Sequence, residues 1–129
     1  MGEPWFPWND PYRTNEVPGA WWFQMSFARQ MAEIEGEISR VLRDKKKLER
    51  IRRDMDYQGE PQIIRHIFGY IKKDPRNTER LEEVVRAEEL TYAFLAGAPG
   101  APSQEEIGAL WARYMNAYLQ ELEGSEGGG

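Results

Sequence analysis

The segment FARQMAEIEGEISRVLRDKKKLERIRRDM, residues 27–55, decides the fold. In its first half, apolar residues recur in alternating steps of four and three, which places them on one stripe of a helix. The stripe is interrupted at Lys45 and resumes at Leu48. We predict one helix over residues 20–57, about 55 Å long, which exceeds a compact body of this size. Either the helix breaks near the charged run 44–47 or it projects from the body, and the lack of glycine or proline between 37 and 57 favours projection.

Three shorter helices are expected after this segment, over about residues 61–73, 75–96 and 103–123. Each has apolar positions at helical spacing. We therefore predict an all-α fold, a small helical bundle of about four helices, with residues 20–123 as a single helical domain and 124–129 as a flexible glycine-rich tail. The residues expected to cap the helices are Pro61 and Asp74 at starts, Gly59, Gly97 and Gly124 at ends, and Ser103 with Glu106 as a capping box.

Residues 1–19, which precede the long helix, are rich in aromatic residues and proline. Prolines at 4, 7, 11 and 18 exclude a regular helix or a central strand through most of this segment, so we expect an extended N-terminal arm. The arm either folds back over its own helices, docks on a neighbouring subunit, or lies at a membrane interface, where its acidic residues disfavour anionic lipid. The aromatic residues predicted to bind a partner are Trp5, Phe6, Trp8, Tyr12, Trp21 and Trp22.

A run of basic residues from 40 to 53 contrasts with the acidic remainder of a chain whose net charge is −5. Arg40, Arg43, Lys47 and Arg50 step by three, four and three, so on a continuous helix they share one face. Such a face has three interpretations: a solvated or intramolecularly paired stretch, a contact for an acidic protein, or a contact for the phosphates of a nucleic acid.

The residue types needed for catalysis or metal binding do not occur in suitable patterns. The chain has no cysteine and one histidine, His66, which cannot form a metal cluster alone and is expected at the boundary of a buried face. The paired glutamates sit on adjacent helix positions and diverge. No glycine-rich phosphate loop follows a strand. We therefore predict no catalytic site, no metal, no cofactor and no small-molecule substrate.

No uncharged stretch is long enough to span a bilayer, and no secretory leader is visible. We expect a soluble protein in the cytoplasm or in a particle assembled inside the cell, without membrane contact. The sequence favours a non-enzymatic helical adaptor or structural subunit of a larger assembly. Its partners would be proteins, including copies of itself, docked through the arm and the long charged helix. The alternative is a small helical nucleic-acid-binding subunit that uses the basic run 40–53.

Overall fold

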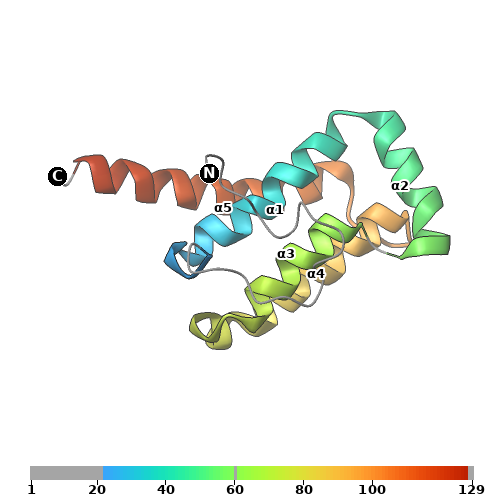
Figure 1. Ribbon diagram of the computed structural model, residues 1–129. Coiled ribbons are helices and arrows are strands. Elements are labelled where there is room, and N and C mark those ends of the chain that lie inside the picture. Colours follow the sequence, from blue (N-terminus) through green and yellow to red (C-terminus); the bar gives the residue numbers. More distant parts are fainter. Residues whose placement is uncertain (1–21, 60, 128–129) are drawn as a thin grey trace, which may run out of the picture.

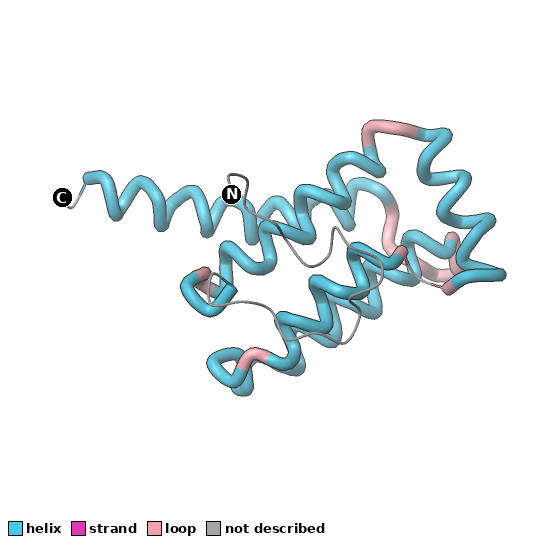
Figure 2. The backbone as a smooth tube through the Cα atoms, in the orientation of Figure 1, coloured by secondary structure: helices cyan, strands magenta, loops and turns pink. Residues whose placement is uncertain are grey.

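The computed structural model describes residues 22–59 and 61–127, and of residues 56–58 and 125–127 the backbone alone. This part of the chain forms five α-helices and two short 3₁₀ turns without a strand, which confirms the all-α prediction for it (Figures 1 and 2). The elements in order are η2 (Trp22–Gln24), α1 (Phe27–Leu42), α2 (Lys45–Gln58), α3 (Gln62–Lys73), η3 (Pro75–Arg80), α4 (Leu81–Ala96) and α5 (Gln104–Gly127).

Helices α1 and α5 lie side by side in opposite directions, and their pairing is the largest contact of the fold. At one end, the hydroxyl of Ser26 donates to the carboxylate of Glu121 over 2.5 Å. One turn further in, Arg29 donates to the Tyr118 hydroxyl at 3.0 Å. The stripe predicted from the 4–3 spacing faces the core in this pair, and its members other than Phe27 are fully buried. Apolar periodicity thus identified the core face of α1.

Helices α3 and α4 lie side by side and form the second half of the body (Figure 1). Aromatic rings connect this half to α5. The ring of Phe68 is edge-on to Tyr92 and to Trp111, with centroids 5.8 Å apart in both pairs. The indole nitrogen of buried Trp111 donates to the hydroxyl of Thr91 at 2.9 Å. The polar atom of this aromatic core, the indole nitrogen, is thus hydrogen-bonded within the body, as a buried indole requires.

The prediction of one long projecting helix over 20–57 is wrong, because the chain turns between α1 and α2. Arg43 ends α1, and Asp44 is extended (φ −131°, ψ 97°) and caps α2 by accepting a hydrogen bond from the Lys47 amide at 3.2 Å. The turn falls where the apolar stripe lapses at Lys45. It directs α2 across the end of the body, where Leu48 is buried and the helix packs against α4 (Figure 1). The free energy gained by burying this face of α2 exceeds what one continuous helix extended into solvent would gain.

Two further boundaries differ from the sequence prediction. Residues 75–80 form the 3₁₀ turn η3, so the helix expected over 75–96 is α-helical only from Leu81. At the other end, α5 continues through Gly124 to Gly127, within the range predicted to be a flexible tail. A single glycine in a helix costs only about 1 kcal/mol relative to alanine, which a long helix tolerates. The bundle therefore has five α-helices in its described part rather than about four.

The predicted caps are mostly present. The amide of Ser103 donates to the Glu106 carboxylate at 2.8 Å, and the Glu106 amide donates back to the Ser103 hydroxyl at 3.1 Å, so the capping box is confirmed. Gly97 ends α4 in the left-handed conformation (φ 68°). Local signals of this type act within a few residues, which is why they can be read from sequence.

A buried polar cluster joins the start of the fold to η3. The amide nitrogen of Gln30 on α1 donates to the carboxylate of Asp74 at 2.8 Å, and Asn77 donates to the Gln30 side-chain oxygen at 2.8 Å. Arg76 donates to the same carboxylate at 2.7 Å and to the backbone oxygen of Met25 at 2.9 Å. Asp74 thus links α1, the α3–η3 corner and the segment before α1. These hydrogen bonds are made to the buried Asp74 carboxylate or to a residue bonded to it, and such bonds are stronger than those between neutral groups. The cluster therefore holds α1 and η3 in a fixed relative position.

Burial alone raises the pKa of Asp74, but the hydrogen bonds from Arg76 and Gln30 and the charge of Arg76 outweigh it and hold the pKa below its usual value. A carboxylate with a lowered folded-state pKa stabilises the protein above its unfolded pKa, near 4, and this contribution is lost as the pH falls through the folded value. We expect Asp74→Asn to lower the free energy of unfolding by about 2 kcal/mol at pH 7. The difference from wild type should shrink below about pH 4.

Urea unfolding at a series of pH values measures this dependence. The matched control is Glu89→Gln, an exposed acid on α4 that should change stability by less than about 0.5 kcal/mol at any pH. An Asp74→Asn difference that stays constant from neutral pH to pH 3 would contradict the assignment of the stabilisation to the ionised carboxylate.

Candidate interaction surface

Helix α2 has one face in the body and one in solvent. Leu48 is buried, and Ile51 and Met55 pack against the core at its edge. These three residues lie within about 60° of one another around the helix, since each residue advances it by about 100°. The helix is closed at its C-terminal end by Gly59 (φ 80°), as the sequence predicted. The position of the apolar edge decides which cations of the basic run face outward.

Arg52 belongs to the basic run but lies on the inward side of α2. Its guanidinium donates to the backbone oxygen of Phe94 at 3.0 Å and stands over the Phe94 ring, 5.3 Å from the centroid. It also lies against Gly97, where an added Cβ would be 3.1 Å from the Arg52 Nε atom. Arg52 therefore ties α2 to the end of α4 and is a structural residue. Arg52 follows Leu48 by four residues and precedes Met55 by three, and this helical spacing from two apolar residues is the sequence signal for its inward position.

Lys46, Arg50 and Arg53 form the outward basic face of α2. Steps of four and three place them opposite the buried edge, and all three are exposed. Among the side chains that the structure describes, no carboxylate lies within ion-pair distance of any of them. Exposed Glu49 borders this face. The face extends about 10 Å along the helix.

The four cations predicted to share a face do not lie on one helix. Arg40 and Arg43 are in and just after the last turn of α1, where Arg40 pairs with Glu37 at 3.1 Å and Arg43 donates to a backbone oxygen of its own helix. Lys47 is half-buried at the start of α2, and only Arg50 of the four belongs to the outward basic face. The turn at Asp44 breaks the register on which the prediction depended.

The aromatic residues predicted to bind a partner are placed by the structure in one case. Trp22 is completely buried in its own chain, with its ring edge-on to Tyr70 of α3 at a centroid distance of 5.6 Å. The other five, Trp5, Phe6, Trp8, Tyr12 and Trp21, lie outside the described residues.

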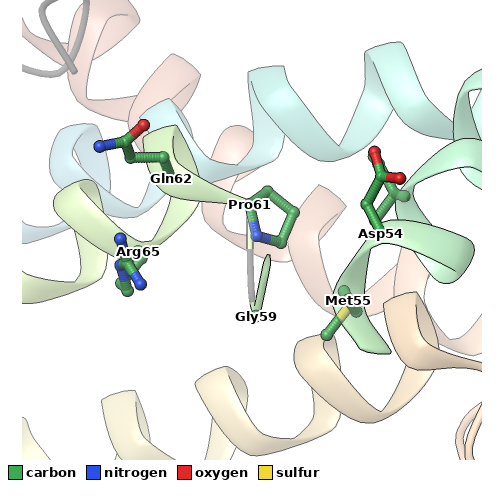
Figure 3. Close-up of a pocket in the computed structure, with 7 residues that line it drawn as sticks. Asp54, Met55, Gly59, Pro61, Gln62 and Arg65 are labelled. Carbon is green, nitrogen blue, oxygen red and sulfur yellow. The ribbon is translucent and has the colours of Figure 1, made fainter. Parts of the chain in front are cut away.

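A shallow hollow of about 260 Å³ lies between α2 and α3. Figure 3 shows Asp54 and Met55 on one side and Gln62 and Arg65 on the other, with Pro61 between them. The lining carries one acid and one base on opposite walls. In the described part of the chain, no group of three or more His, Asp or Glu side chains is arranged to hold a metal ion. No helix there is long and apolar enough to cross a membrane.

The other strongly perturbed group is Tyr114. Burial, followed by the hydrogen bond that its hydroxyl donates to Glu83 and the charge of that carboxylate, raises its pKa far above the usual value. A phenol held in its protonated form by a donated hydrogen bond is a structural link between α5 and α4. An activated nucleophile needs a lowered pKa, whereas the pKa of Tyr114 is raised.

Comparisons of this chain with protein-family models, with curated proteins and with solved structures gave no match.

The two neighbouring arginines of α2 allow a direct test of which cations are structural. Arg52→Ala removes a charged hydrogen bond and a cation–π contact, and we expect it to lower the free energy of unfolding by about 1–2 kcal/mol. Arg53→Ala is the matched control, because it removes the same side chain from the solvent side and should change stability by less than about 0.5 kcal/mol. Thermal or urea unfolding of both variants measures this difference. Equal effects would contradict the orientation of α2.

Proposed function

We propose that this protein is a non-enzymatic helical binding subunit that docks on an acidic protein partner through the outward basic face of α2. The observation that supports this most is the outward basic face itself. Lys46, Arg50 and Arg53 are exposed and have no ion-pair partner among the described residues. The third arginine of α2, Arg52, is half-buried and ties the helix to the end of α4, so the three outward cations are not needed to hold α2 in place.

An acidic protein suits this face better than a nucleic acid does. The face is one short row of three cations bordered by Glu49, which allows few simultaneous phosphate contacts. The chain as a whole carries a net charge of −5, so its long-range field repels a polyanion such as duplex DNA. Short-range pairing with a few carboxylates on a partner needs only the local charge. Nucleic-acid binding through the run 40–53 remains the alternative.

The partner can be a different protein or a second copy of this chain. Helix α4 holds four acidic side chains, Glu82, Glu83, Glu88 and Glu89. A second copy that presents this side to α2 would match the outward basic face in charge. We therefore keep self-association among the expected modes of assembly.

A binding assay with two labelled probes, a polyglutamate peptide and a duplex DNA of random sequence, tests the proposal. At about 50 mM salt, we expect wild-type protein to bind the peptide more tightly than the duplex. Replacing Lys46, Arg50 and Arg53 together by alanine should weaken peptide binding at least about tenfold, which corresponds to about 1.4 kcal/mol.

The matched control replaces Lys73, Arg86 and Arg113 by alanine, since these are three exposed cations on other helices and the change in net charge is the same. We expect it to change peptide binding less than about threefold, a long-range effect that salt screens. Equal losses in both triple variants would contradict a local site on α2. Tighter binding of the duplex, with a steep salt dependence removed by the α2 variant, would support the nucleic-acid alternative instead.

A further inference from the structure

The acidic side chains of α4 divide between the body and solvent. Glu83 accepts a hydrogen bond from a tyrosine of α5, and Glu88 pairs with a lysine of α3 at 2.8 Å. Glu82 and Glu89 are exposed, and among the side chains that the structure describes no cation lies within ion-pair distance of either. These two acids are therefore not needed to hold α4 against its neighbours.

Glu82, Val85, Arg86 and Glu89 form the outward acidic face of α4. At about 100° per residue, the four side chains lie within about 100° of one another around the helix. All four are exposed, and Val85, at 38 %, is among the exposed large apolar side chains of the described chain. The two acids stand seven residues apart, which is about 10 Å along the helix. One cation and one apolar side chain lie between them.

The outward basic face of α2 has the same spacing with the opposite charges. Lys46 and Arg53 also stand seven residues apart, and exposed Glu49 and Arg50 lie between them. The four positions of α2 and the four positions of α4 thus follow the same intervals of three, one and three residues. Where α4 has an acid at each end, α2 has a cation.

The two faces match in charge when the helices run in the same direction. In this parallel arrangement, each close pair joins opposite charges or places a long side chain on an apolar one: Lys46 with Glu82, Arg53 with Glu89, Glu49 with Arg86, and Arg50 with Val85. The aliphatic stem of Arg50 can cover Val85 while its guanidinium stays in water.

An antiparallel arrangement of the same faces is less favourable. In a parallel pair of right-handed helices, the side chains on one flank meet those on the opposite flank of the neighbour, whereas in an antiparallel pair they meet those on the same flank. The antiparallel arrangement would therefore bring Arg50 against Arg86, two like charges. The charge pattern thus specifies the direction of the contact as well as its members.

We propose that the outward basic face of α2 binds the outward acidic face of α4 in a second copy of this chain, with the two helices parallel. The inference rests on the proposed function, because it names the acidic partner of the same face. Within one chain the two faces do not meet, since α2 contacts α4 with its inward side through Arg52. Exposed ion pairs are individually weak and are screened by salt, so we expect reversible association at high protein concentration and low salt.

Sedimentation equilibrium of the full-length protein at about 50 mM salt tests the proposal by charge reversal. Lys46→Glu with Arg53→Glu reverses the face of α2, and Glu82→Lys with Glu89→Lys reverses the face of α4. We expect wild-type protein to self-associate and either reversed variant alone to have a dissociation constant at least about tenfold higher. An equimolar mixture of the two variants should restore association, because each supplies the face that complements the other.

The matched control is Lys73→Glu with Arg113→Glu, which changes the net charge as much as the reversal on α2 does. It should raise the dissociation constant less than about threefold. The reversal on α4 separates a local contact from long-range repulsion. It brings the net charge of −5 closer to zero, so it would strengthen association if overall charge alone mattered. Far-UV circular dichroism checks that each variant keeps its helical signal.

Three outcomes would overturn the proposal: a wild-type protein that stays monomeric, a mixture of folded reversed variants that associates no more than either alone, or a control that loses as much association as the reversed variants. The polyglutamate assay distinguishes this failure from failure of the proposed function. A monomeric wild type that still binds the peptide through the outward basic face would mean that only the identity of the partner is wrong. A monomeric wild type that does not bind the peptide would contradict both.

Discussion

The turn held by Asp44 is the constraint on which the arrangement of the other elements depends. Its carboxylate accepts a hydrogen bond from the Lys47 amide and begins a new helix where the core stripe of α1 lapses. Because of this turn, the second half of the basic segment lies against α4 instead of extending into solvent. The turn thereby determines which cations are used inside the protein and which face outward.

Which side chains of α2 face inward and which face solvent follows from the packing of its apolar edge. The apolar edge around Leu48 must be buried, and Arg52 lies beside it, where it donates to the backbone oxygen of Phe94 near the end of α4. The residues on the other side keep their charges in water. A binding surface of this kind needs no special geometry beyond an amphipathic helix of which one face is already occupied. At the opposite corner, the cluster around buried Asp74 holds α1 and η3 together by hydrogen bonds.

Local signals in the sequence predicted much of this fold. The stripe of α1, the capping box at Ser103 and the stop at Gly97 were correct because each depends on residues within one or two turns. A break near residues 44–47 was the less favoured of two alternatives, because an N-cap residue within a helical pattern ends the helix only when packing against a distant helix stabilises the turn. The set of four cations predicted to share one face depended on a continuous helix, and the turn between α1 and α2 divides that set between two helices. The polar cluster around Asp74 joins residues 44 or more positions apart and has no local signature.

The central claim, that the chain turns between α1 and α2, is tested most directly by a distance between spin labels. The chain has no cysteine, so Glu33→Cys and Arg53→Cys provide two unique labelling sites, one on each helix. In a continuous helix, their backbone positions would be about 30 Å apart. We predict a distribution centred at no more than about two thirds of that value, in the full-length protein at neutral pH. A distribution centred near the full length of a straight helix would contradict the account.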